Sequence, residues 1–305
     1  MIISRNCNSF LIIALASIVG WGLVGVFIRL SSLQSPLLII SMRFMITFSV
    51  LLIVLLAQGK TKQVFKDLFS NNTIIVLSLV LFLTYLFGTI AFMLAPIGEV
   101  TLLISSSPFF VILFKKLKGI VISKNEYIGT IIAILGVAVI FYPHLSTKLS
   151  LSGSSLLGQV FALSGALLFA IFVMISNTQN VLNKQINTLS VTLGTCLFGA
   201  LIFLYILLFD KTVFPLGELN GVNILSIFSL GIFSTAIPTF GFAHASKKLP
   251  PLLLSNLLLM EPVFAIVFAY LFLSEIPNSY IYPGILLILL GLLKVSRKTS
   301  ADNIV

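Results

Sequence analysis

Two charged residues lie inside long apolar stretches of the sequence. Glu261 is the tenth residue of the apolar run 252–273, and Arg43 is the seventh residue of the run 37–56. A charge in hydrocarbon costs several kcal/mol, so such a residue usually faces a polar cavity or an opposite charge. Because a helix rises 1.5 Å per residue, the two depths differ by roughly 6 to 8 Å, within reach of a long Arg side chain. Glu261 is therefore a candidate substrate ligand or proton carrier and Arg43 a candidate ligand. The alternative is a static ion pair between them.

Two prolines, Pro108 and Pro262, occupy equivalent places inside the apolar runs 100–114 and 252–273. Proline removes one backbone hydrogen bond and bends a helix, which leaves the carbonyl four residues earlier without its donor. In a membrane such freed groups bind neighbours, water or a ligand, so broken helices line cavities. Ser106 and Ser107 precede the first proline and are candidate ligands, and Ser107 is equivalent to Glu261. Alternatively, the prolines only shape helix packing.

Aromatic and hydroxyl side chains at middle depth complete the candidate site. Trp21 lies between two glycines within its run, away from the interfaces where tryptophan normally gathers. Each hydroxyl has an alternative role, because in apolar helices it more often bonds a neighbouring helix than a ligand. The predicted substrate-binding set is Trp21, Arg43, Thr84, Tyr85, Ser106, Ser107, Thr235, Thr239, Asn256 and Glu261.

The sequence offers no arrangement of catalytic or metal-binding residues in its apolar core. Asp67, Asp210 and Asp302 all fall between or beyond the apolar runs, and the only two histidines are His144 and His244. Neither an aspartyl dyad nor a Ser-His pair is available there. There is also no His or Cys cluster for a metal and no Gly-rich Lys-Ser/Thr loop for ATP. We therefore expect no enzymatic activity, no cofactor and no metal.

Composition predicts the elements that must position these side chains. Charged residues make 9% of the chain and hydrophobic residues 59%, whereas a soluble domain carries about 25% charged residues. The apolar runs approach the roughly 20 residues that cross a bilayer, and they lack the alternation of barrel strands. The sequence predicts an all-α integral membrane protein with ten transmembrane helices, at 10–30, 37–56, 74–94, 100–114, 127–142, 156–175, 189–209, 222–243, 252–273 and 281–295.

The basic residues gather on one side of this arrangement. When connections alternate between the two faces, 14 of the 18 Lys and Arg residues fall on the side of the N-terminus. Only Arg29, Lys148 and Lys211 fall on the other side, and Arg43 lies within a span. Positive charge marks the cytoplasmic side, so both termini are predicted in the cytoplasm, in a cell inner (plasma) membrane. This distribution also accounts for the net charge of +10 without a nucleic-acid partner.

An internal repeat relates two halves of the chain. Residues 91–96 and 108–110 match residues 245–250 and 262–264 at an offset of 154. Gly129 and Gly136 match Gly284 and Gly291 at an offset of 155. Residues 10–143 and 154–297 are therefore predicted to be two five-helix repeats, and the odd number inverts the second. The glycines predict a close-packing face, within the chain or in a dimer.

These features resemble the EamA-type ten-helix transporters of the drug/metabolite transporter (DMT) superfamily. The resemblance rests on the Ala-containing turn before each proline-bearing helix, on the run 261–265 (Glu-Pro-Val-Phe-Ala), on the run 271–275 (Leu-Phe-Leu-Ser-Glu) and on the Gly-rich fifth and tenth helices. It implies a secondary transporter that moves a small polar metabolite, an amino acid or its derivative, by alternating access, with proton coupling or exchange.

Several alternatives stay open at this point. They are uptake or exchange of S-adenosylmethionine or a nucleotide-type metabolite, efflux of drugs or other amphiphiles, and, more remotely, a membrane scaffold or channel. The expected partners are a small-molecule substrate and the lipid bilayer. The substrate, the direction of transport, the coupling ion and the choice between monomer and homodimer are not determined by the sequence.

Overall fold

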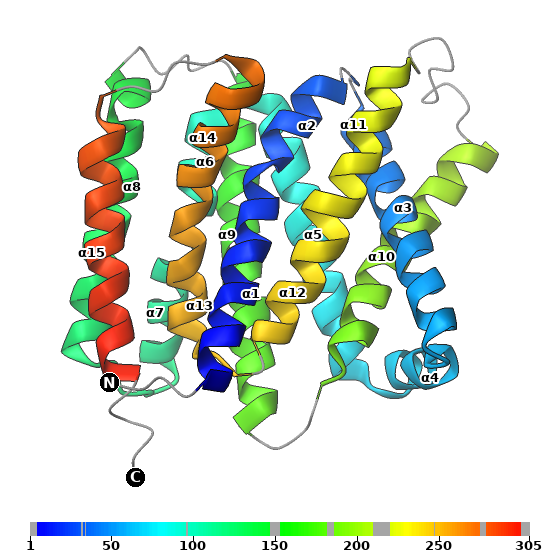
Figure 1. The fold of residues 1–305 in the computed structure, drawn as a ribbon, viewed down its shortest axis with the longest axis horizontal. Helices are drawn as coiled ribbons and strands as arrows, with labels where there is room; N and C mark the ends of the chain where they lie inside the picture. Colours follow the sequence, from blue (N-terminus) through cyan, green and yellow to red (C-terminus); the bar gives the residue numbers. More distant parts are fainter. Residues whose placement is uncertain are drawn as a thin grey trace.

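The chain forms a bundle of packed helices (Figure 1). The structure, a computed structural model, describes residues 5–31, 33, 35–95, 97–146, 153–181, 186–209, 220–246, 248–274 and 279–299. In these ranges every regular element is helical. In chain order the elements are α1 (Arg5–Gly22), α2 (Val24–Ser31), α3 (Pro36–Ala57), α4 (Thr61–Ser70), α5 (Asn72–Leu94), α6 (Ile97–Ile104), α7 (Ser107–Leu117), α8 (Lys124–Ser146), α9 (Gly153–Val181), α10 (Thr188–Phe209), α11 (Gly221–Gly231), the π-helix η2 (Ile232–Ala236), α12 (Ile237–Ala245), α13 (Pro251–Leu257), the 3₁₀ turn η3 (Leu258–Met260), α14 (Glu261–Leu273) and α15 (Ile281–Thr299).

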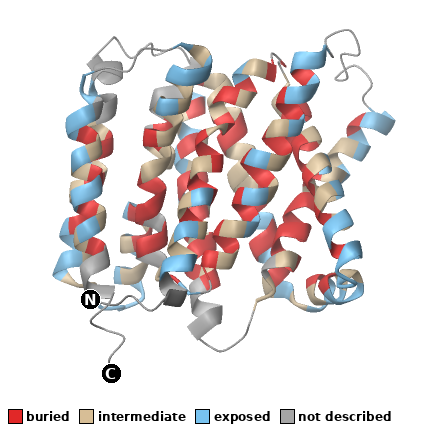
Figure 2. Ribbon diagram, viewed as in Figure 1, coloured by how far each residue is buried: buried red, intermediate tan, exposed pale blue. Residues whose placement is uncertain are grey.

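Many of these helices are long and apolar enough to cross a membrane. Within the described ranges six qualify by length and composition, and two shorter apolar helices accompany them. Large apolar side chains such as Phe209 and Leu117 are about three-quarters exposed, at 75% and 74%. Figure 2 shows the exposed residues along the outer helices and the buried residues concentrated within the bundle. An apolar outer surface of this kind is suited to lipid. The prediction of an all-helical, multi-pass membrane protein is confirmed, whereas the number of ten spans stays a prediction. The six long helices are Asn8–Ser31, Pro36–Ala57, Asn72–Leu94, Leu156–Ser176, Leu189–Phe209 and Gly221–Ala245.

Side-chain caps fix where two of the central helices begin. The Ser35 hydroxyl accepts a hydrogen bond from a first-turn backbone N–H of α3 at 3.3 Å. The Asn71 side chain does the same for α5 at 3.0 Å. Such caps satisfy backbone donors that have no partner within the helix. They fix the start of the two helices that carry Arg43 and Tyr85.

Two spans are broken before the repeat-equivalent prolines. α6 ends at Ile104 and α7 begins at Ser107, just before Pro108. In the second half, the 3₁₀ turn η3 separates α13 from α14, which begins one residue before Pro262. A third irregularity is the π-helix η2, which precedes Pro238. In each case the ring of proline and its missing N–H prevent a regular helix from continuing.

The glycines of α8 and α15 allow these two helices to pack closely. A Cβ atom at Gly129 would lie 2.8 Å from the Gly291 carbonyl oxygen, and one at Gly136 would lie 2.7 Å from that of Gly284. Since Gly129 faces Gly291 and Gly136 faces Gly284, the helices run antiparallel. The predicted glycine face therefore packs inside the chain. The contacts are reciprocal, as they are across a two-fold interface.

The short helix α4 lies between two apolar runs, in a segment for which the sequence predicts no span. Val64 and Leu68 are buried, and the side chains of Lys62 and Lys66 are exposed. The Asn187 amide donates a hydrogen bond to the Asp67 carboxylate at 2.8 Å. At ten residues α4 is too short to be stable alone, so its stability comes from packing against the rest of the bundle. A helix of this length does not stand out in the sequence beside the longer apolar runs.

Candidate functional site

A cavity of about 90 Å³ lies where the broken helices meet the centre of the bundle. It reaches residues on both sides of the two helix breaks, Ile104, Ser107, Leu258 and Glu261, together with residues of α1, α3, α5 and α9. Its lining is mostly apolar and aromatic, with a few polar groups, which is typical of a small-molecule site. The lining residues are Trp21, Val24, Arg43, Leu81, Thr84, Tyr85, Gly88, Thr89, Phe92, Ile104, Ser105, Ser107, Phe169, Leu258 and Glu261.

Arg43 is held in the wall of this cavity by the π-helix η2. Its Nε donates to the Thr235 hydroxyl, and its Nη2 donates to the Ser234 carbonyl oxygen at 3.0 Å. Pro238 has no N–H to donate to the carbonyl four residues earlier, which is that of Ser234. The guanidinium carbon also lies 4.7 Å from the centroid of the Tyr85 ring, a cation–π distance. A π-helix at such a place is typical of functional sites.

Tyr85 connects the helices on either side of the cavity through its hydroxyl. The Trp21 indole Nε1 donates to the Tyr85 oxygen at 2.9 Å. The Tyr85 hydroxyl is also hydrogen-bonded to the Thr239 hydroxyl, so α1, α5 and α12 meet at one point. Residues 85 and 239 are 154 positions apart, which is the offset of the internal repeat. The neighbouring Thr84 lines the cavity, but its hydroxyl donates to the Val80 carbonyl of its own helix at 2.9 Å.

Glu261 and Ser107 occupy repeat-equivalent positions at the start of α14 and α7, and both line the cavity. The Glu261 side chain is half-buried, and the ion pairs of the described residues include none between it and Arg43. The Ser107 residue is only 1% exposed, and among the described residues its hydroxyl finds no hydrogen-bond partner. Arg43, Glu261 and the Ser107 hydroxyl therefore line one cavity without bonding to one another.

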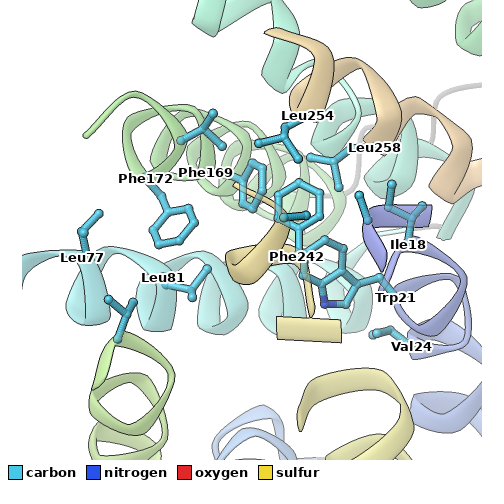
Figure 3. Packing of buried hydrophobic residues seen from close by; sticks show 14 of the residues in the cluster. Ile18, Trp21, Val24, Leu77, Leu81, Phe169, Phe172, Phe242, Leu254 and Leu258 are labelled. Carbon is cyan, nitrogen blue, oxygen red and sulfur yellow. The ribbon is translucent and has the colours of Figure 1, made fainter. Parts of the chain in front are cut away.

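Trp21 and Phe169, which line the cavity, belong to a cluster of buried aromatic side chains (Figure 3). The Trp21 ring lies 4.9 Å from the Phe242 ring and 6.3 Å from the Phe169 ring, measured between centroids. Phe172 continues the cluster, with its ring 6.0 Å from that of Phe169. Ring pairs at these distances are favourable beyond their burial of surface.

The predicted residues divide into three groups by their position. Trp21, Arg43, Thr84, Tyr85, Ser107 and Glu261 line the cavity. Thr235 and Thr239 lie behind it, where they hold Arg43 and Tyr85. Ser106 and Asn256 are elsewhere: the Ser106 hydroxyl donates to the Leu103 carbonyl at 2.6 Å, and the Asn256 amide donates to the Thr130 hydroxyl at 2.9 Å. The Asn256 bond joins α13 to α8, as the alternative interpretation of such groups allows, whereas the Ser106 bond is local to its own segment.

Several lining residues were missed by sequence reasoning. Phe92 and Phe169 are two of 27 phenylalanines, and nothing in the sequence marks which of these face inward. Ser105 precedes Pro108 together with Ser106 and Ser107, so the sequence marks it as well, although the predicted set names only the other two. Thr89 lies one helical turn beyond Tyr85, so the periodicity of an α-helix would have found it once Tyr85 was accepted.

The sequence is similar to one family of transporters and to individual proteins named as transporters. The EamA-like transporter family matches residues 8–142 and 156–297. An "Uncharacterized transporter" of Clostridium kluyveri is 29% identical over 204 residues, which cover 65% of this chain and 61% of that protein. The match thus spans about three-fifths of the length of that relative.

Two further comparisons cover almost the whole chain. An "Uncharacterized transporter" of Archaeoglobus fulgidus is 27% identical over 280 residues, which cover 91% of this chain and 95% of that protein. A solved crystal structure, 22% identical in sequence, superposes with a TM-score of 0.76 over 95% of this chain and 97% of its own. That likeness shows a shared fold. Since the family match extends over both halves, the chain belongs to the EamA-like transporter family, a family of membrane transporters in the DMT superfamily.

Proposed function

We propose that this protein moves a small zwitterionic solute, an amino acid or amino-acid derivative, across the cell's inner membrane by alternating access. One observation carries the proposal: a single small cavity is lined by both Arg43 and Glu261 in otherwise apolar surroundings. A charge in such surroundings is stable only with a partner or water. A solute with one carboxylate and one ammonium group would supply an opposite charge to each of them, beyond the neutral partners that Arg43 already has.

The remaining polar groups favour an orientation for this solute. Arg43, the Ser107 hydroxyl and the N-terminus of α7 together favour the carboxylate, because a helix N-terminus attracts negative charge. Glu261 favours the ammonium group. A water molecule needs roughly 10–15 Å³ on the same measure of volume, so a cavity of about 90 Å³ suits a compact solute. S-adenosylmethionine, a nucleotide-type metabolite or a drug would require the cavity to widen.

The proposed cycle rests on two inverted five-helix repeats, at residues 10–143 and 154–297, with ten spans in all. Support comes from the breaks at Pro108 and Pro262 and from the reciprocal antiparallel packing of α8 and α15. Architectures of this kind transport by rocking one half against the other around a central site. The excess of basic residues on one side supports cytoplasmic termini.

Transport in proteoliposomes tests the proposal. Radiolabelled amino acids, S-adenosylmethionine and a cationic dye are screened for saturable uptake and counterflow. We expect one amino acid or derivative to be transported, and we expect Glu261→Gln and Arg43→Ala to abolish its transport. Glu126→Gln is the matched control, because Glu126 lies outside the cavity, 3.4 Å from Lys115. Transport of the dye alone would refute the zwitterion proposal.

The same preparation tests proton coupling by Glu261. If this carboxyl group carries the proton, an imposed pH gradient drives uptake by the wild type, and Glu261→Gln retains at most exchange that does not respond to pH. Unchanged uptake and unchanged pH dependence in Glu261→Gln would reject the role of proton carrier.

A further inference from the structure

A second, larger cavity of about 420 Å³ lies between α3 and α12 and is separate from the central one. Along α3 it extends from Thr47 to Gln58, and along α12 from Ile237 to His244. The eleven helical rises from Thr47 to Gln58 measure about 16 Å, close to half of the roughly 30 Å hydrocarbon thickness. We call this cavity the α3–α12 groove. Its lining residues are Ile13, Thr47, Val50, Leu51, Val54, Gln58, Leu189, Thr192, Ala236, Ile237, Phe240, Gly241 and His244.

The groove is open to the side, toward the surroundings of the bundle. Val54 is 41% exposed, Ile237 is 55% exposed and Phe240 is 38% exposed, although all three lie within helices of a membrane-spanning protein. Surfaces of this kind are in contact with lipid tails. Most of the groove is lined by aliphatic and aromatic side chains, and among the described residues no Asp, Glu, Lys or Arg lines it. The chemistry of its interior fits a hydrocarbon chain.

The rim of the groove is polar and positively charged at one end. α3 and α12 both end at this rim, where Gln58 and His244 line the cavity. Lys60 follows Gln58 by two residues, Lys248 follows His244 by four, and both lysines are exposed. Figure 1 shows α4, which carries two further exposed lysines, at the same end of the bundle. Basic residues next to a membrane span attract anionic headgroups.

We propose that the α3–α12 groove binds an anionic phospholipid, with one acyl chain in the groove and the headgroup at Gln58, Lys60 and Lys248. The match is threefold: groove length to one leaflet, apolar lining to the chain, and basic rim to the phosphate. The deep end adjoins the central site, because Ala236 follows Thr235, the residue that holds Arg43. Thr47 at the same end donates to the Gly231 carbonyl at 2.7 Å, so the bound chain ends where α3 meets η2.

Lipid retention measured by native mass spectrometry tests this site without any transport assay. The protein is released from nanodiscs that contain equal phosphatidylglycerol and phosphatidylcholine. We expect the wild type to retain one phosphatidylglycerol. Val50→Trp places an indole ring in the groove, and we expect this variant to lose the bound phosphatidylglycerol. Ile53→Trp, which adds the same side chain to the same helix at an exposed position outside the groove, keeps it.

The headgroup part of the site has its own variants. Lys60→Gln with Lys248→Gln is expected to lower the preference for phosphatidylglycerol by about fivefold per lysine, since each basic residue near the surface contributes about 1 kcal/mol. Lys116→Gln with Lys118→Gln, two exposed lysines at the end of α7, is the matched control and leaves the preference unchanged. Size-exclusion and thermal unfolding profiles identify any variant that fails to fold. The lysine pair carries the test if Val50→Trp does not fold.

Three results would overturn the proposal. They are equal retention by Val50→Trp and Ile53→Trp, equal binding of the two lipids by the wild type, and displacement of the lipid by a transported solute. The third would assign the groove to the solute path. Since lipid retention is measured directly, the proposed solute can be wrong while this site is right, and the reverse holds as well.

Discussion

The contact between Arg43 and Thr235 allows a quantitative test of how the cavity wall is held. The Thr235 hydroxyl accepts from Arg43 Nε and donates to the Leu230 carbonyl at 2.7 Å, so both of its hydrogen-bonding functions are used. Thr235→Val removes the hydroxyl at nearly constant volume. It leaves the guanidinium nitrogen without a partner at a residue that is 1% exposed.

The expected loss follows from two hydrogen bonds of different kinds. A hydrogen bond to a charged group contributes about 1.5–3 kcal/mol in proteins, while the neutral bond from Thr235 to Leu230, within one helical segment, contributes about 0.5 kcal/mol. We therefore expect Thr235→Val to lower the free energy of unfolding by about 2–3 kcal/mol. Arg43→Lys loses the planar fork that reaches Thr235 and Ser234 together. The double variant should show a coupling energy of about 1–2 kcal/mol.

Unfolding by denaturing detergent, followed through a label in α3, measures the four members of this double-mutant cycle. Thr235→Ser is the control, because it keeps the hydroxyl and should stay within about 0.5 kcal/mol of the wild type. Independent sites are additive within about 0.3–0.5 kcal/mol. A coupling energy below that limit would refute the conclusion that Thr235 holds Arg43.

Three further predictions concern other parts of the fold. Gly291→Leu should lower the free energy of unfolding by about 1–3 kcal/mol, because its Cβ would lie 2.7 Å from the Ala133 backbone nitrogen; thermal unfolding measures this, and an unchanged midpoint would contradict the α8–α15 packing. Asn187→Ala should cost about 1–2 kcal/mol through the lost bonds to Asp67 and to the Leu189 N–H, and hydrogen exchange should become faster in α4 and at the start of α10. Ser107→Ala should leave stability unchanged within about 0.5 kcal/mol, since the hydroxyl has no described partner, yet weaken solute binding. Trp21 is the sole tryptophan and lines the cavity, so its fluorescence reports that binding directly, and equal affinity of Ser107→Ala and wild type would exclude Ser107 as a ligand.

Features with a large energetic cost were the ones predictable from the sequence. Glu261 and Arg43 stood out because a charge in an apolar run is expensive, and both line the cavity. Pro108 and Pro262 also predicted a structural feature, since a helix that contains proline loses a backbone hydrogen bond, and both helices break there. The glycine face was predicted from spacing, and the structure places it between α8 and α15.

Features that depend on which side of a helix faces inward were not predictable. The spans are apolar all round, so the pattern that orients an amphipathic helix is missing. Asn256 and Thr235 are both buried polar residues at middle depth, yet one packs toward α8 and the other holds Arg43. That choice is made by helix rotation, which arises from packing between segments distant in the sequence. The position of Phe169 in the cavity lining was not predictable for the same reason.

The proposed repeats have different consequences for the two hydrogen bonds across the centre, Tyr85–Thr239 and Arg43–Thr235. In an inverted-repeat transporter the two end states are related by exchange of the conformations of the halves. The Tyr85–Thr239 bond joins equivalent positions, so this exchange maps the bond onto itself, and it can persist in both states. The Arg43–Thr235 bond has no such counterpart, because α10, which corresponds to α3 in helix order, contains no charged residue. If the repeats exchange conformations as proposed, the Arg43–Thr235 bond belongs to one end state only, and replacing Arg43 should shift the population toward the other.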